Sequence, residues 1–386
     1  MRFPRGSDRA DVAIIGGGIV GLSLAWYLRK LGVERVTLVE RGEPGQQSTG
    51  AASGGIRRQF GTRVEIEMTL AGWRFYEEVL SHSSYTDAFD QAGYAFLAGP
   101  RQIDALGRAW MLQQEIGLPV RWLGPAELAE MFPYCELHGL VGGTFCGEDG
   151  FIDPPAVVQW LLRQCRAQGV HILEQTPVDA VTIAGRRIRT IRSGRTIVAA
   201  DAVVNAAGAW AGCVGTLAGV NIPVEPSPRV KYVTDSGRHF SANSPLIIDL
   251  PTGTYVRLRQ GGAILGVKPK KRVVSFNVET NQRIFARMAR RVCERFPGLH
   301  GAKLRGLIKG LYELTPDGLP LGGPVAGVTG LYVIAGFNGH GIMHGPGVAR
   351  ALAELIVMGK SEALDLGPLR PDRFERHIAT KHYNFL

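Results

Sequence analysis

The strongest constraint on the fold lies between residues 11 and 40. This segment, DVAIIGGGIVGLSLAWYLRKLGVERVTLVE, begins with an apolar strand-like run at 12–15 and passes directly into the pattern Gly16-x-Gly18-x-x-Gly21. A run with helical spacing of apolar residues follows, and a second strand-like run at 36–39 ends at Glu40. Strand, glycine turn, helix and strand in this order predict a βαβ unit, which requires a parallel sheet.

The three glycines of this unit have positions that suit a bound dinucleotide. Gly16 would permit a tight turn, Gly18 a close approach of the backbone to a pyrophosphate, and Gly21 close packing of the helix on the strand. The helix N-terminus supplies unpaired N–H groups and a partial positive charge. Glu40 could accept hydrogen bonds from ribose hydroxyls, and its charge disfavours a 2′-phosphate. This unit alone therefore leaves FAD and NAD open and disfavours NADP.

Composition excludes several classes of protein. The chain of 386 residues is long enough for roughly two to three domains, and its 51 glycines, without a low-complexity tract, indicate many tight turns. The formal net charge is +10, but Lys and Arg are spread along the chain apart from short clusters such as KPKK at 268–271. No nucleic-acid-binding motif accompanies them. We therefore expect no nucleic-acid partner and interpret the charge as an attraction for anionic substrates.

The cysteines and the N-terminus predict a cytoplasmic protein. The five cysteines, without a C-x-x-C pair, are interpreted as reduced and mostly buried. Neither H-E-x-x-H nor paired Cys/His spacing occurs, so no metal site is expected. The N-terminal MRFPRGSDRA lacks the apolar stretch of a signal peptide, and no apolar run reaches the ~18 residues of a membrane span.

The segment after Glu40 predicts a loop at a ligand. It is rich in Gly, Ser and Thr up to about residue 62, which suits a loop pressed against a flat cofactor. Arg57 and Arg58 follow in this loop, where an arginine pair could bind an anion or form a solvated surface.

A third strand ends in small residues near the middle of the chain. A strand pair at 186–199, turning at Ser193-Gly194, leads to VVNAAGAWA at 203–211. There an apolar strand runs into small residues before a helix that starts near Ala209. Small residues at the carboxyl end of a strand suit either a ligand or close packing.

The segment GFNGHGIMHGPGVA at 336–349 places five glycines and two histidines between a strand-like run, LYVIA, and a helix-like run, RALAELIVM. Together with GGGIVG, VVNAAGAWA and YELTPDGLPLGG at 312–323, it completes a set of four ordered motifs. In this order and spacing the chain resembles the FAD-dependent D-amino-acid oxidase superfamily over nearly its whole length. The nearest branch resembles sarcosine oxidases, glycine oxidase and the β-type subunits of proline and hydroxyproline dehydrogenases.

The resemblance implies an α/β fold, α+β overall, in which a Rossmann-like FAD-binding domain is interleaved with an antiparallel-sheet substrate domain. The FAD-binding domain would use residues 1–85, 145–222 and 305–386, and the substrate domain residues 86–144 and 223–304. Within the latter, TYVRLRQGGAILGVKPKK predicts two strands joined near Gln260-Gly261-Gly262.

The resemblance also implies a reaction. An FAD-dependent oxidoreductase would oxidise the C–N bond of a small amino acid or secondary amine, of the glycine, sarcosine, proline, hydroxyproline or D-amino-acid type. Hydride would pass to flavin N5, and the resulting imine would hydrolyse. O2 or another acceptor would then take the electrons, and the protein could be a homo-oligomer or pair with an electron-transfer subunit. The alternatives are a dehydrogenase that passes electrons to a partner and a non-catalytic FAD-binding assembly factor.

The motifs imply which residues contact FAD. The terminal motif would lie along the flavin, with the following helix directing its N-terminus at the ring, where reduced flavin carries negative charge. Relatives with covalent flavin use a cysteine or an early histidine where this chain has Gly310 and the stretch STGA at 48–51, so FAD should bind non-covalently. The expected contacts are Gly16, Gly18, Ile19, Gly21, Glu40, Arg41, Ser48, Thr49, Ser53, Gly54, Val178, Ala206, Ala207, Gly208, Trp210, Gly310, Gly336, Asn338, Gly339, His340, Gly341, Ile342 and Met343.

The same resemblance implies a substrate site. Arg57 occupies the position of the arginine that binds the substrate carboxylate in the sarcosine oxidase branch, with Arg58 as the next candidate. Tyr255, Lys268 and His340 complete the candidate catalytic set, each with a packing or solvated role as its alternative. Ile264 and Met343 stand where oxidases of this branch carry lysines. This favours an acceptor other than O2, unless Lys268 replaces those lysines.

Overall fold

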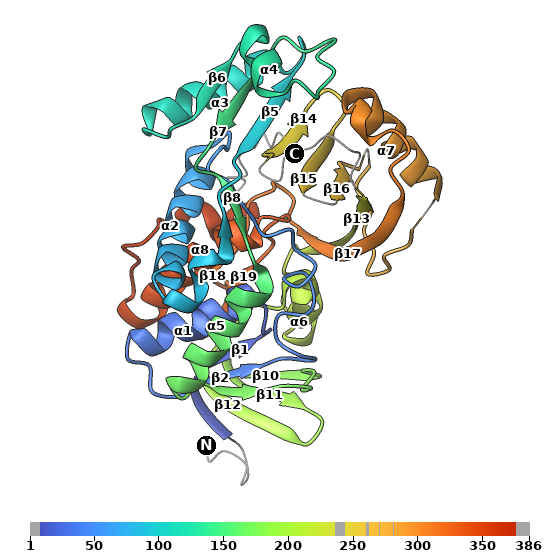
Figure 1. Ribbon diagram of the computed structural model, residues 1–386. Coiled ribbons are helices and arrows are strands. Elements are labelled where there is room, and N and C mark those ends of the chain that lie inside the picture. The colour runs from blue at the N-terminus through green and yellow to red at the C-terminus, as the bar shows by residue number, and fades with distance from the viewer. Residues whose placement is uncertain (1–7, 236–243, 260–261, 270, 281, 376–386) are drawn as a thin grey trace.

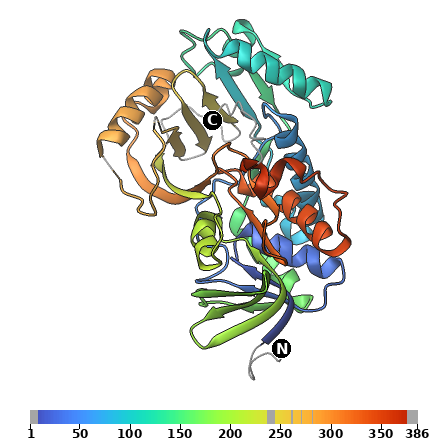
Figure 2. The same ribbon diagram turned by 180° about the vertical axis from the view of Figure 1, so that it is seen from behind.

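The computed structural model describes residues 8–235, 244–259, 262–269, 271–280 and 282–375. Two large sheets make up two halves of the molecule (Figure 1), and the half that contains the N-terminus also holds the last long helix, α8 (Gly341–Met358). Figure 2 shows α8 in red beside the first helix, α1 (Ile19–Lys30), in blue. Within the described ranges, every helix is too short or too polar to span a lipid bilayer.

The first sheet is mainly parallel. Its parallel strands are β1 (Asp8–Ile15), β2 (Val36–Val39), β9 (His171–Leu173), β12 (Thr196–Asn205) and β19 (Leu331–Ala335), and its antiparallel strands are β10 (Ala180–Ala184), β11 (Arg187–Ser193) and β18 (Leu321–Pro324). The register places Ile15 beside both Val39 and Asn205, and Asn205 beside Val333. The glycine turn, Glu40 and the small residues after Asn205 therefore meet at one edge of the sheet, as the motifs predict.

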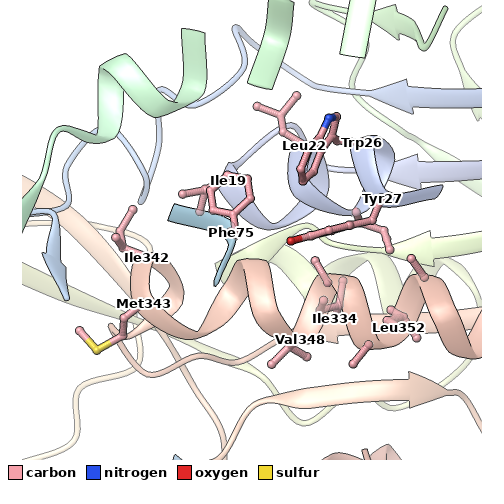
Figure 3. Close-up of a cluster of buried hydrophobic side chains, with 14 of the residues drawn as sticks. Ile19, Leu22, Trp26, Tyr27, Phe75, Ile334, Ile342, Met343, Val348 and Leu352 are labelled. Atoms are coloured by element: carbon pink, nitrogen blue, oxygen red, sulfur yellow. The ribbon is translucent and has the colours of Figure 1, made fainter. Parts of the chain in front are cut away.

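Four helices cover one face of this sheet: α1, α2 (Arg63–Leu80), α5 (Pro154–Ala167) and α8. Figure 3 shows their shared apolar core, where Trp26 and Tyr27 of α1 lie near Phe75 of α2 and Leu352 of α8. On the opposite face, the core combines residues of the sheet, including its strand β11, with the short helix α6 (Ala211–Leu217), which follows the one-turn helix η2 (Gly208–Trp210).

Glycine allows α2 and α8 to cross in contact. A β-carbon on Gly72 would lie 2.0 Å from the Met343 carbonyl oxygen, and one on Gly347 would lie 2.5 Å from the Gly72 nitrogen. No other side chain would permit this approach, so the glycines in the second half of the terminal motif serve packing.

The second sheet has the strand order β17, β13, β16, β15, β14, β5, β7, β6. Every neighbouring pair along it is antiparallel except β14 and β5, which are parallel. The strands are β5 (Tyr94–Ala98), β6 (Arg121–Leu123), β7 (Gly142–Cys146), β13 (Glu225–Asp235), β14 (Leu246–Asp249), β15 (Thr254–Arg259), β16 (Gly262–Val267) and β17 (Leu304–Leu314). The expected antiparallel sheet thus contains one parallel pair, which joins two segments far apart in the chain.

Helices α4 (Pro125–Met131) and α7 (Gln282–Arg295) pack on one face of the second sheet, and α3 (Ile103–Glu115) contributes to a cluster on the other. A small third sheet joins β3 (Gly55–Ile56), β8 (Gly150–Ile152) and β4 (Phe89–Asp90). The remaining short helices are η1 (Ser83–Ala88), η3 (Pro297–Leu299), η4 (Gly367–Leu369) and η5 (Pro371–Phe374).

Strand β17 belongs to the second sheet. It pairs along its whole length with β13 in the second sheet, although nearly all of it falls in the predicted FAD-binding segment 305–386. Strands β15 and β16 match the two predicted around 260, while Gln260 and Gly261 of the expected turn lie outside the described residues. The domain bounds themselves stay a prediction.

Candidate active site

The glycine turn after β1 needs glycine at two of its three positions. Gly16 has a φ of +114°, and a β-carbon there would lie 2.4 Å from the Ala206 carbonyl oxygen. A β-carbon on Gly21 would lie 2.0 Å from the Gly16 carbonyl oxygen, so Gly21 serves the close packing of α1. Helix α1 begins after Gly18, and the Ile19 N–H donates to Thr49 Oγ1 at 3.1 Å. This hydrogen bond fixes the loop after Glu40 against the start of the helix.

Glu40 is held at the end of β2 by backbone donors. Its side chain is buried, and Oε2 accepts from the Gly17 N–H at 2.7 Å while Oε1 accepts from the Gly42 N–H at 2.8 Å. A carboxylate oxygen can accept more than one hydrogen bond, so each oxygen keeps acceptor capacity toward the cavity that Glu40 lines. This is the placement expected for an acid that holds ribose hydroxyls.

Two cavities extend from this edge of the sheet. One, of about 290 Å³, contains Glu40 and the small residues after β12, and the other, of about 460 Å³, reaches under the second sheet. They share Ile19, Val20, Ser48, Thr49 and Glu313, so they are adjacent. The predicted contacts lining the smaller cavity are Gly16, Gly18, Ile19, Glu40, Arg41, Ser48, Thr49, Val178, Ala206, Ala207, Gly208 and Trp210.

The outer wall of the smaller cavity is aromatic and cationic. The Arg41 guanidinium lies 3.5 Å from the centroid of the Trp210 ring, which in turn stacks on Phe276 at 5.3 Å. An elongated space with a glycine cradle, a ribose-type acid and a flat aromatic wall fits the dinucleotide portion of FAD.

The terminal glycine motif is fixed by Asn338. Asn338 adopts a φ of +52°, its side-chain amide donates to the Gly318 carbonyl at 2.8 Å, and its Oδ1 accepts from the Thr315 N–H. Gly339, with a φ of +90°, leaves room for the Tyr312 ring, since a β-carbon would lie 2.3 Å from Tyr312 Cζ. Gly336 does not line the larger cavity but donates its N–H to Glu313 at 2.9 Å.

The N-terminus of α8 opens into the larger cavity. Gly341, Ile342 and Met343 begin this helix and line the cavity. The Tyr76 hydroxyl donates to the Ile342 carbonyl at 2.6 Å and anchors the first turn. The partial positive charge of a helix N-terminus stabilises negative charge on a group placed there. The predicted contacts Ser53, Gly54, Gly310, Asn338, Gly339 and His340 line the same cavity.

Arg57 is a buried cation in the wall of the larger cavity. It is 5% exposed, and its guanidinium lies 3.9 Å from the centroid of the Phe60 ring. Nη1 donates to the Gln59 carbonyl and Nη2 lies 3.2 Å from His340 Nε2. No carboxylate of the described residues forms an ion pair with it, and burial lowers its pKa. A buried cation without an ion pair is suited to an anionic ligand.

His340 is the neutral partner of Arg57. Burial lowers its pKa well below the ordinary value, and the charge of Arg57 and the neighbouring His344 lower it further. The neutral ring can accept a hydrogen bond from the guanidinium. His340 therefore orients Arg57.

Arg58 is not part of the cavity. Its guanidinium forms an ion pair with Glu148 at 2.8 Å and lies over the Trp73 ring, while its backbone N–H donates to Asp149. Successive side chains in an extended segment point in opposite directions, so bringing Arg57 to the cavity turns Arg58 away from it. Arg58, the second candidate for the substrate carboxylate, therefore lies outside the lining of this cavity.

Tyr255 and Lys268 line the larger cavity, as predicted, and five residues that sequence reasoning did not select join them. These are Tyr94 of β5, Arg229 and Lys231 of β13, and Tyr312 and Glu313 of β17. The alternation Arg229-Val230-Lys231 in a strand-like run could have indicated that both cations share one face.

Glu313 lies where the two cavities meet. Its carboxylate accepts from the backbone N–H groups of Gly336 and Phe337. Burial raises its pKa to about 7, although these hydrogen bonds oppose the shift. The group can therefore hold or release a proton near neutral pH.

Comparison with known proteins agrees with this geometry. The chain is 28% identical over 415 residues to the FAD-dependent oxidoreductase domain-containing protein 1 of Bos taurus, covering 95% of this chain and 85% of that protein. It is 27% identical to the mitochondrial sarcosine dehydrogenase of Homo sapiens, covering 92% of this chain but only 40% of that protein. The solved structure of L-proline dehydrogenase from P. horikoshii superposes with a TM-score of 0.88 at 27% identity, covering 96% of this chain and 99% of that one.

A family model provides the assignment. The model named DAO, described as FAD dependent oxidoreductase, matches residues 11–355, a range that contains the βαβ unit, Arg57, the cationic strand β13 and the terminal glycine motif. The chain belongs to this family of FAD-dependent oxidoreductases.

Proposed function

We propose that this FAD-dependent oxidoreductase oxidises the C–N bond of a small amino acid or secondary amine. The observation that carries the proposal is Arg57, a buried cation without an ion pair among the described residues, in the same cavity as the N-terminus of α8. A guanidinium in this setting would bind a carboxylate with two parallel hydrogen bonds and so fix its orientation.

The residues around Arg57 would position the substrate. FAD, when bound, supplies the two-electron acceptor. His340 forms a hydrogen bond with the Arg57 guanidinium, and the Phe60 ring packs against the guanidinium as a cation–π partner. Tyr94, Tyr255 and Tyr312 supply flat walls with polar ends, which can pack against an aliphatic amine and hydrogen-bond its polar groups. The dominant contribution of the chain would be orientation.

Two relatives support this substrate class. Sarcosine and L-proline, the compounds in the names of the human and P. horikoshii proteins, both combine a carboxylate with a secondary amine. Both would present an anion to Arg57 and a neutral or cationic nitrogen to the rest of the cavity.

FAD would bind non-covalently, because the positions at which some relatives attach their flavin covalently carry no suitable side chain here. Gly310 offers no side chain, and a β-carbon there would lie 2.9 Å from Ala51 Cβ. Residues 48–51 contain no histidine or cysteine. Precipitation of the protein with acid should therefore release all of its yellow colour into the supernatant.

Anaerobic mixing tests the function. The purified yellow protein is mixed with glycine, sarcosine, D- and L-proline, hydroxyprolines and D-alanine, and absorbance near 450 nm is followed. Bleaching by a carboxylate-bearing amine is expected. Admission of air then separates an oxidase, which regains colour at once, from a dehydrogenase, which needs another acceptor such as an electron-transfer partner. Absence of bleaching with any amine, in protein that contains FAD, would contradict the proposal and favour a non-catalytic FAD-binding role.

A further inference from the structure

The larger cavity contains a second group of cations, away from Arg57. Arg229 and Lys231 are two residues apart on β13, so their side chains share one face of the second sheet. Lys268 directly follows β16, the strand that pairs with β13 as far as Tyr232 and Leu265. All three cations line the larger cavity.

These cations have no acidic partners among the described residues. Arg229 Nη1 donates to Ser227 Oγ at 2.8 Å and to the Pro228 carbonyl at 2.9 Å, while its Nε and Nη2 form no hydrogen bond with a residue that the structure describes. Lys231 Nζ donates to the Ala51 carbonyl at 2.6 Å and to Ser53 Oγ at 2.8 Å. Lys268, on the exposed side of the cavity, forms no ion pair in the described part of the chain.

The cavity contains too little negative charge to balance this group. Glu313 is the sole acidic residue among those described that line it, and its carboxylate is already held by backbone N–H groups at the junction with the smaller cavity. Burial lowers the pKa of Lys231 to about 8, and burial together with the charge of Arg229 lowers the pKa of Lys268. Partly buried like charges without counter-ions destabilise the empty site and would be relieved by an anion.

Tyr312 lies near both Arg229 and Arg57. The Arg229 guanidinium lies 4.5 Å from the centroid of the Tyr312 ring, and the charges of both Arg229 and Arg57 lower the pKa of the Tyr312 hydroxyl, against the larger effect of burial. Both arginines therefore lie near one aromatic ring, in the lining of the same cavity. A small ligand in this cavity could contact both.

Resting on the amine oxidation proposed above, we propose that the substrate is an amine with two carboxylates, one bound by Arg57 and the other by Arg229 with Lys268. Lys231 is already engaged by the loop at 51–53, which it fixes to β13. A substrate with one carboxylate would leave Arg229 and Lys268 without a counter-ion.

A matched pair of substrates tests the inference. Sarcosine and iminodiacetate share the secondary amine and one carboxymethyl group, and iminodiacetate adds a carboxylate on the other carbon; aspartate and glutamate extend the series against alanine. We expect the rate of anaerobic flavin reduction at low substrate concentration to be about tenfold to hundredfold higher for the dicarboxylate of the preferred pair. Arg229→Gln should remove this advantage, so that the rates of the two substrates become alike, while Arg229→Lys should restore part of it. Lys309→Gln, an exposed cation outside the cavity on the same strand as Tyr312, should change neither rate.

A binding measurement tests the inference without relying on substrate turnover. Malonate or succinate should perturb the flavin spectrum of the wild type with a Kd about tenfold to hundredfold below that of acetate, and Arg229→Gln should make the two alike. The inference would be overturned if the monocarboxylate and the dicarboxylate of every pair reduced the flavin at equal rates and if Arg229→Gln changed both rates equally. That result would leave the proposed amine oxidation intact. Loss of both reactions in Arg229→Gln, with FAD retained, would also overturn it, because Arg229 would then act on the cofactor. Failure of every amine to reduce the flavin would refute the proposed function itself.

Discussion

Replacing Arg57 with glutamine tests the substrate site with a magnitude that follows from its contacts. The guanidinium would form two charge-assisted hydrogen bonds with a carboxylate, each worth about 1.5–3 kcal/mol. Glutamine keeps one donor and loses the charge, so about 3 kcal/mol of binding should be lost, which corresponds to a rise of about a hundredfold in KM. FAD content should remain that of the wild type.

The same variant should not destabilise the protein. Arg57 is 5% exposed and forms no ion pair with a described residue, although Glu65 and Asp149 are near enough to affect its pKa. Removal of a buried charge without an ion pair is neutral or stabilising, so the melting temperature should not fall. A rise in KM without a fall in melting temperature would separate an effect on function from an effect on folding.

The control is the neighbouring arginine. Arg58→Gln removes an equal charge that forms an ion pair with Glu148 outside the cavity, so KM should stay within about threefold of the wild type while stability falls by about 1 kcal/mol or less. KM would be measured by steady-state reduction of an artificial electron acceptor with the substrate found in the anaerobic screen. A change in KM below threefold for Arg57→Gln, or equal changes in the two variants, would refute the role of Arg57.

Three other changes have defined outcomes. Glu40→Ala removes the acceptor that holds the N–H groups of Gly17 and Gly42 and would face the ribose, so the Kd for FAD, measured by quenching of its fluorescence, should rise at least about tenfold; an unchanged Kd would exclude the ribose contact. Gly347→Ala places a β-carbon 2.5 Å from the Gly72 nitrogen and should cost about 1–3 kcal/mol in urea unfolding, whereas Gly306→Ala, with no atom within 4 Å of its β-carbon, should cost much less; equal costs would contradict the crossing geometry. The pKa of Glu313 is raised to about 7 from its ordinary 4.5, so its proton favours the folded state: this stabilisation is complete below pH ~4.5 and is lost as pH rises through 7. The melting temperature of Glu313→Gln should therefore decline less between pH 5 and pH 8 than that of the wild type, and parallel declines would show that Glu313 does not titrate in this range.

The elements of the parallel sheet could be predicted because their signals are local. Strand β2 (Val36–Val39) coincides with the predicted run at 36–39, and β11 and β12 enclose the turn predicted at Ser193-Gly194. Periodicity within a few residues defines such elements. Their meeting at one edge followed from parallel strands alone, which is why Gly16, Glu40 and Ala206 lie together.

The choice between neighbouring side chains could not be predicted. Arg57 and Arg58 are chemically alike, and which of them faces the cavity depends on the pairing of β3 with β8 in a separate part of the chain. Likewise, the placement of Arg229 and Lys231 in the cavity depends on the pairing of β13 with β16 and on the position of the loop at 51–53. The parallel pairing of β5 with β14 is a long-range contact of the same kind. The sequence motifs located the residues expected at the cofactor, and the second sheet contributes side chains of the larger cavity that the motifs did not indicate.

The most direct test of the central claim is a crystal structure of the yellow protein soaked with a carboxylate ligand that is not oxidised, such as malonate. We expect the flavin ring between the loop at 48–54 and the stretch at 338–343, with a carboxylate of the ligand within hydrogen-bond distance of the Arg57 guanidinium. A flavin placed outside this cavity, or a ligand bound beside the flavin without contact to Arg57, would contradict the account.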